Sequence, residues 1–309
     1  MHSLLTTLTD HLIDYAGLFP PASLSMSDAV AAYASARQGK HAALLGRFVV
    51  PAYRLEELAG VLLSIAHQGH REQEAEASQQ RKLWKLSVLI GMERSQDLAL
   101  VQGFNQRYAM IAQADCLEFK ASRSDEILAI PKLLPADLQR LAVYVEIDVQ
   151  QRLAESVMAL QRAGLYAKIR TGGITSEAFP RPQQVVAFLG ACIEQQVAFK
   201  ATAGLHHLLC GEYALSYTPD SKQATMFGFL NLLLATAIVQ SELGSHYDKA
   251  LELLLAREPG SFQLLPDRLC WQGVCFTVAD LQRMRTYALH SFGSCSFKEP
   301  CAELAIFER

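Results

Sequence analysis

Two lysine-bearing segments decide how this chain can fold: Tyr166-Ala-Lys-Ile-Arg-Thr-Gly-Gly173 and Ala198-Phe-Lys-Ala-Thr-Ala-Gly-Leu-His-His207. Each is a short apolar run that reaches a cation and then glycine, which is typical of a buried parallel strand ending at the rim of a sheet. Lysine is rarely buried without a partner or a task. Two lysines at matching positions therefore indicate either an active site or a pair of structural ion pairs.

Short strand-like runs of the same kind recur along the chain and alternate with amphipathic helical segments. Together with the two lysine segments they lie at residues 12–18, 47–51, 86–90, 116–119, 143–147, 166–169, 197–200 and 291–294. Such an alternation over 309 residues predicts one (β/α)8 barrel domain, residues 1–309. A doubly wound open sheet is the alternative, because periodicity does not establish closure.

The connection between the seventh and eighth predicted strands, residues 208–289, is much longer than one crossover helix requires. It is predicted to be a mostly helical insertion, with helices near 225–242 and 247–257 and then a stretch that carries Cys270, Trp271 and Cys275. In a barrel this insertion would begin at the face where catalysis takes place. It is therefore predicted to be a lid or an oligomer contact, with a plain structural elaboration as the alternative.

The bulk composition argues against several classes of partner. A net charge of −3 and the lack of a basic stripe give no support for nucleic-acid binding. The most apolar stretch, 227–239, is too short to span a bilayer, and the N-terminal residues lack the basic start of a signal peptide. Seven scattered cysteines favour reduced thiols. These features predict a cytoplasmic protein without membrane partners, and a homo-oligomer stays open.

Strand alternation places an unusual amount of charge inside the predicted barrel, because every second residue of a strand points to the same face. Val143, Val145 and Ile147 supply the apolar face that packs on helices, so the alternate residues point inward. The predicted interior charges are three acids and four bases: Glu118, Glu146, Asp148, Lys120, Lys168, Arg170 and Lys200. Buried ion pairs rarely repay their desolvation, so the set favours a catalytic or ligand site.

Five segments, taken in chain order, resemble deoxyribose-phosphate aldolase and related class I aldolases. Leu12-Ile-Asp-Tyr-Ala-Gly-Leu-Phe-Pro-Pro21 is similar to that family's first strand, Ile-Asp-His-Thr-Leu-Leu-x-Pro, and Ala114-Asp-Cys-Leu-Glu118 to its Ala-Asp-Glu-(Ile/Val)-Asp strand. Ala167-Lys-Ile-Arg-Thr-Gly172 and Phe199-Lys-Ala-Thr-Ala-Gly204 parallel its two lysine strands. Ser291-Phe-Gly-Ser-Cys-Ser296 resembles its phosphate-binding turn. The likeness covers most of the barrel but not residues 208–289.

The resemblance implies a lyase in which Lys168 forms a Schiff base with a carbonyl substrate and Lys200 is the second active-site lysine. It also implies that Glu118 moves protons, with Asp14 as helper. Three departures put the substrate in question: Arg170 stands where the family has a small serine, Glu118 is longer than the family's aspartate, and His206-His207 lie in a different loop. An inward arginine suits a carboxylate, which its planar fork can bind through two hydrogen bonds.

The expected substrate is a small anionic carbonyl compound, with a phosphate or a carboxylate. Because a Schiff-base enzyme needs a neutral amine, the pKa of Lys168 is predicted to lie below that of free lysine, about 10.4. No dinucleotide or Walker-type fingerprint is present, so no cofactor is expected. The residues predicted to bind the substrate or its anion are Arg170, Thr171, Gly172, Gly173, Thr202, Gly204, Gly293, Ser294, Glu146, Arg47 and His206.

Two other functions remain open from the sequence. Glu118, Glu146, Asp148, His206 and His207 could together bind a divalent metal, giving a metal-dependent lyase or hydrolase. The third possibility is a barrel that binds a small anion without catalysing a reaction.

Overall fold

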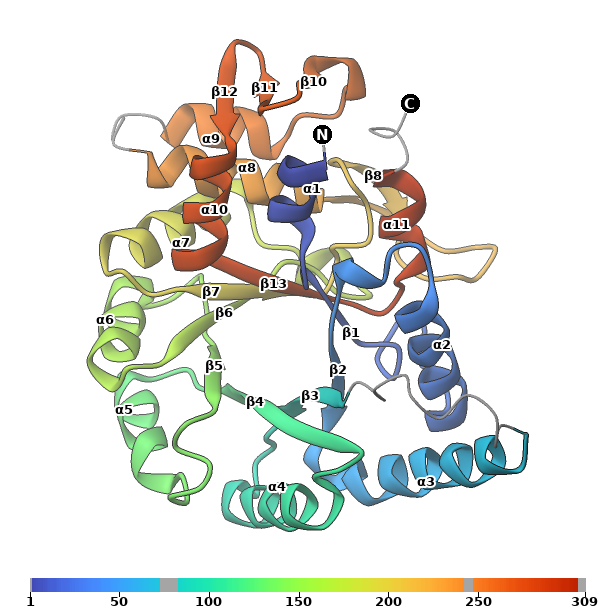
Figure 1. Cartoon of the computed structure of the whole chain (residues 1–309). Helices are drawn as coiled ribbons and strands as arrows, with labels where there is room; N and C mark the ends of the chain where they lie inside the picture. Colours follow the sequence, from blue (N-terminus) through green and yellow to red (C-terminus); the bar gives the residue numbers. More distant parts are fainter. Residues whose placement is uncertain (1, 73–82, 242–246, 305–309) are drawn as a thin grey trace.

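The chain forms a closed ring of parallel strands with helices around it, as seen in a computed structural model that describes residues 2–72, 83–241 and 247–304 (Figure 1). The order around the ring is β1-β13-β7-β6-β5-β4-β3-β2. The ring strands are β1 (Ile13–Tyr15), β2 (Leu45–Pro51), β3 (Trp84–Leu89), β4 (Ala112–Lys120), β5 (Ala142–Glu146), β6 (Tyr166–Arg170), β7 (Phe199–Thr202) and β13 (Leu289–Ser294).

The predicted barrel is confirmed, and each predicted strand overlaps one strand of the ring. The open-sheet alternative is wrong because β1 pairs with β2 on one side and with β13 on the other, which closes the sheet. Val143 and Val145 are buried, as expected for the helix-facing side of a barrel strand.

Helices cover the outside of the ring (Figure 1). Ordinary capping signals set several of their ends: Ser25 accepts the amide of Asp28 at the start of α2, and Gly164 ends α6 in the left-handed region at φ 65°. The helices are α1 (His2–Thr9), α2 (Met26–Gln38), α3 (Leu55–Glu72), α4 (Arg94–Tyr108), α5 (Ser124–Leu133), α6 (Leu153–Ala163), α7 (Pro182–Glu194), α8 (Phe229–Gln240), α9 (Tyr247–Leu254), α10 (Val278–Tyr287) and α11 (Lys298–Leu304). None of the helices in the described ranges has the length and apolar character needed to cross a bilayer.

The connection between β7 and β13 contains both helices and strands, so the prediction of a mostly helical insertion is not confirmed. It begins with a hairpin of β8 (Gly211–Ala214) and β9 (Gln223–Met226), continues through α8 and α9, and adds a small sheet of β10 (Phe262–Leu264), β11 (Arg268–Trp271) and β12 (Val274–Thr277) before α10. This sheet lies beyond α9, outside the ring (Figure 1). Helix α8 is buried on all sides from Phe229 to Ile238, which makes it a core helix.

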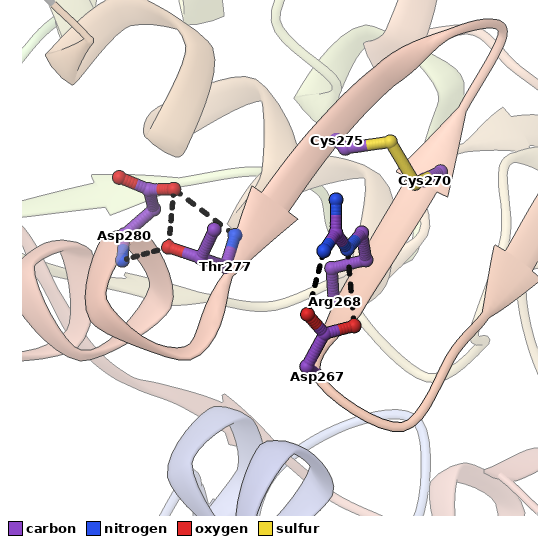
Figure 2. Close-up of a disulfide and its surroundings, with 6 residues drawn as sticks. All are labelled: Asp267, Arg268, Cys270, Cys275, Thr277 and Asp280. Carbon is purple, nitrogen blue, oxygen red and sulfur yellow. Dashed lines mark hydrogen bonds and ion pairs between the residues drawn. A yellow bond between two sulfur atoms is a disulfide. The ribbon is translucent and has the colours of Figure 1, made fainter.

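Cys270 and Cys275 form a disulfide across β11 and β12, whereas the sequence predicted reduced thiols throughout (Figure 2). The two residues are register partners on neighbouring antiparallel strands, which brings their side chains together. The hairpin that joins them is not evident from spacing alone, because the same spacing occurs in helices and loops. The other five cysteines are free and buried.

Candidate functional site

Both lysines singled out by the sequence lie side by side in the barrel interior. In the strand register Lys168 is the neighbour of Glu146 on one side and of Lys200 on the other, and Lys200 is in turn the neighbour of Ser291. Lys168 is 4% exposed and Lys200 1%. Four adjacent strands therefore contribute one polar layer across the barrel.

Glu118 lies between the two lysines and contacts both. Its Oε2 atom is 2.7 Å from Lys168 Nζ, and its Oε1 atom is 2.7 Å from Lys200 Nζ. Each lysine has a second carboxylate: Lys168 Nζ is 3.1 Å from Glu146 Oε2, and Lys200 Nζ is 2.5 Å from Asp14 Oδ2. The four predicted catalytic residues, Lys168, Lys200, Glu118 and Asp14, are thus brought together.

Three residues that support this network were not predicted. The hydroxyl of Ser87 donates to Glu118 Oε1 at 2.5 Å, and that of Ser291 donates to Asp14 Oδ2 at 2.9 Å. Gly46 makes room for Asp14, because a Cβ atom at this position would be 2.5 Å from Asp14 Oδ1. The two serines could have been found from the sequence, since Ser87 lies within the predicted strand 86–90 and Ser291 begins the predicted strand 291–294.

The carboxylates reverse the predicted direction of the lysine pKa. Burial alone would lower the pKa of Lys168, but Glu118 and Glu146 outweigh it and the pKa is raised. Lys200 behaves in the same way: burial opposes its charge, and Asp14 and Glu118 raise its pKa. Burial likewise works against ionisation of Glu118, while both lysines hold its pKa well below the usual range. Lys168 and Lys200 are therefore ammonium groups, and Glu118 is a carboxylate.

A cavity of about 260 Å³ opens onto these charges at the carboxyl ends of the ring strands. Lys168, Lys200, Glu118 and Arg170 form its charged side. The remaining wall is largely apolar and includes Phe19, Pro20, Pro21, Ile174, Leu215 and Met226. Leu215 and Met226 belong to the β8–β9 hairpin, so that part of the 208–289 connection covers the site.

Arg170 lies at the mouth of the cavity, with a side chain that is 50% exposed. Its Nε atom is 3.1 Å from Glu146 Oε1, while Lys168 contacts the other oxygen of the same carboxylate. Glu146 therefore orients the arginine relative to the lysine. Burial would raise the pKa of Glu146, but the charges of Lys168 and Arg170 lower it, so this carboxylate stays ionised.

Three of the predicted charged residues do not line the cavity: the interior charges Lys120 and Asp148, and Arg47, which was predicted to bind the anion. Lys120 is the last residue of β4 and Asp148 lies beyond the end of β5, and both are exposed. The guanidinium of Arg47 pairs with Asp115, with Nε 2.6 Å from Oδ1, and it does not line the cavity. Arg47 contributes its backbone amide to the site, which donates to Asp14 Oδ1 at 2.8 Å.

The predicted phosphate turn is already engaged with the protein. Ser294 Oγ is 3.0 Å from His206 Nδ1 and also accepts the amide of Ser296, and Ser294 does not line the cavity. His206 does line the cavity, but burial lowers its pKa to about 4, so its neutral ring adds no positive charge for an anion. The binding of an anion by Ser294 therefore stays a prediction, and in this structure its hydroxyl contacts His206.

The loops after β6 and β7 approach each other closely at two glycines. A Cβ atom on Gly172 would be 2.8 Å from the Cα of Gly204, and Gly204 has a φ of +73°. The hydroxyl of Thr171 donates to the carbonyl of Ala203 at 2.6 Å, so Thr171 and Gly172 hold the rim without lining the cavity. Gly173, Thr202, Gly204 and Gly293 do line it, as predicted.

The ligands proposed for a metal site do not converge. Within the described residues there is no group of three or more histidine, cysteine or acidic side chains that could hold a metal ion. His207 Nδ1 instead lies 2.6 Å from Glu303 Oε1, and its ring stacks on Tyr213. No protein-family model and no curated protein matches this chain.

Proposed function

We propose that this protein is a Schiff-base lyase of the aldolase type, acting on a small anionic carbonyl compound. The observation that carries the proposal is a pair of buried lysines, adjacent in register and facing a cavity at the catalytic end of a barrel. The resemblance to class I aldolases supports the same chemistry.

Lys168 is the better nucleophile of the two. It is 4% exposed, whereas Lys200 is 1% exposed and is bound by Asp14, which is fully buried. Lys200 therefore serves to keep positive charge beside Lys168. Glu118, 2.7 Å from Lys168 Nζ, is placed to take the ammonium proton and return it to the carbinolamine oxygen when water leaves.

Borohydride trapping tests the proposal. The wild-type protein is incubated with acetaldehyde, acetone, pyruvate and glyceraldehyde 3-phosphate in separate reactions, reduced, digested and examined by peptide mass spectrometry. We expect a stoichiometric adduct on the peptide that contains Lys168. Exposed Lys120 serves as the internal control for non-specific modification. No adduct with any of these carbonyls, or one no greater at Lys168 than at Lys120, would refute the proposed function.

The pKa of Lys168 predicts an alkaline profile for adduct formation. Since the ion pairs raise this pKa, the neutral amine is scarcer at neutral pH than in free lysine, and trapping should still increase through about pH 10. Glu146→Gln removes one of the two charges that raise the pKa, and should move the midpoint to lower pH by about 1–3 units.

Ser87→Ala is the matched control for the pH profile, because it removes a hydrogen bond to Glu118 without changing any charge. Its midpoint should stay close to that of the wild type. A wild-type midpoint below that of free lysine, or an unchanged midpoint in Glu146→Gln, would show that the carboxylates do not control the amine.

A further inference from the structure

The spacing of Lys168 and Arg170 fits a carboxylate between them. In the unliganded protein the Glu146 carboxylate contacts Lys168 Nζ through one oxygen and Arg170 Nε through the other, both at 3.1 Å. Lys168 and Arg170 are two residues apart on β6, so their side chains leave the strand on the same side. A ligand that reaches Lys168 therefore comes within reach of the guanidinium.

The guanidinium has donors left for a ligand. Arginine carries five N–H donors, and only the Nε–H group is directed at Glu146. Within residues 2–72, 83–241 and 247–304, Glu146 is the hydrogen-bonding partner recorded for this side chain. The two terminal nitrogens can therefore bind a carboxylate through two parallel hydrogen bonds, the geometry in which arginine recognises carboxylates.

Part of the remaining cavity wall is apolar and suits an apolar substituent. Ser294, the hydroxyl expected at the phosphate, is bound to His206 and does not line the cavity. The apolar residues that line the cavity include Phe19, Pro20, Pro21 and, from the hairpin, Met226. Such a wall desolvates an alkyl or aryl group without offering hydrogen bonds to sugar hydroxyls.

We infer that the substrate is a 4-hydroxy-2-oxo acid whose C4 carbon bears an apolar group; this inference rests on the proposed Schiff-base function. The carboxylate binds Arg170, the C2 carbonyl carbon is attacked by the neutral amine of Lys168, and the apolar group lies against Phe19, Pro20, Pro21 and Met226. Loss of water from the adduct leaves an iminium at C2.

The reaction balances without an oxidant or a reductant. The C4 hydroxyl gives its proton to Glu118, the C3–C4 bond breaks, and its electron pair forms the C2–C3 double bond of an enamine. The C4 fragment leaves as an aldehyde with its apolar group. Glu118 returns the proton to C3, and water then releases a 2-oxo acid from Lys168. The net result is one bond cleaved and one molecule split into two carbonyl products.

Matched carbonyl probes test this inference. Adduct formation with 2-oxopentanoate is compared with that of 2-pentanone, which has the same ketone and alkyl chain but no carboxylate. A charged, bidentate hydrogen bond should make the half-saturating concentration of the oxo acid lower by about tenfold or more. The half-saturating concentration of 2-pentanone divided by that of 2-oxopentanoate should fall towards one in Arg170→Gln. In Arg170→Lys this ratio should fall part of the way. Arg140→Gln, an exposed arginine before β5, is the control and should retain the ratio.

The outcomes separate the two proposals. No adduct with either probe refutes the Schiff-base function and this inference with it. An adduct on Lys168 with no preference for the oxo acid, or a preference that survives Arg170→Gln, overturns the substrate class alone. Tighter binding of glyceraldehyde 3-phosphate than of 2-oxopentanoate would also overturn it, since it would place a phosphate in the site.

Discussion

Lys168→Met should abolish the borohydride-trapped adduct while leaving a folded protein. Methionine has a similar length and no amine, so no imine can form. The loss of the cation is tolerable because each acid that it contacts keeps another partner: Glu118 retains Lys200, and Glu146 retains Arg170. The measurement is intact-protein mass after reduction with a saturating carbonyl, with circular dichroism to establish folding.

Lys120→Met is the control for Lys168→Met, because it removes an exposed lysine at the end of β4. It should form the adduct as the wild type does. An adduct that persists on folded Lys168→Met, at the stoichiometry of the wild type, would assign the nucleophile to another residue. Lys200 would then be the first to examine, since it faces the same cavity.

Lys200→Met should cost about 3–5 kcal/mol of folding free energy, the usual effect of removing one partner from a buried ion pair. The cost is larger than for Lys168→Met because Asp14 is fully buried and, in the part of the chain that the structure describes, Lys200 is its ion-pair partner. Without that lysine, Asp14 keeps only neutral donors, the amide of Arg47 and the hydroxyl of Ser291. Urea unfolding at neutral pH measures the difference.

The folding free energy lost in Lys200→Met should depend on pH. The raised pKa of Lys200 gives stability that is present below the unfolded value, about 10.4, and fades as the pH rises through the folded value. The lowered pKa of Glu118 gives stability that is present above about 4.3 and fades as the pH falls. The wild type and Lys200→Met should therefore differ most between about pH 5 and 10. If Lys200→Met loses no more than Lys168→Met there, the burial of Asp14 is not the dominant cost.

The sequence was sufficient for the ring and for its central charges because both depend on short-range patterns. Apolar runs of strand length predicted every ring strand. The alternation of residues along a strand predicted that Glu118, Glu146, Lys168 and Lys200 point into the barrel. The predicted interior positions of Lys120 and Asp148 were wrong because Lys120 is the exposed last residue of β4 and Asp148 lies beyond the end of β5. Arg47 was misplaced because its partner Asp115 lies next to a register shift between β3 and β4, which no spacing in the sequence reveals.

The pKa prediction failed for a different reason. Counting cations near Lys168 suggested a lowered pKa, but the count left out how close the acids would come. Two carboxylate oxygens within 3.1 Å outweigh both burial and the neighbouring lysine. These distances are set by the register in which the consecutive strands β4, β5 and β6 pair, and the sequence pattern does not specify that register.

The origin of the apolar wall has a consequence for how this protein can diversify. The charges come from strands of the ring, where neighbouring strands set their positions. Leu215 and Met226 come from a hairpin that adds no strand to the ring. Replacement of that hairpin should change which substrates the cavity accepts. The charged residues of the ring would remain in place.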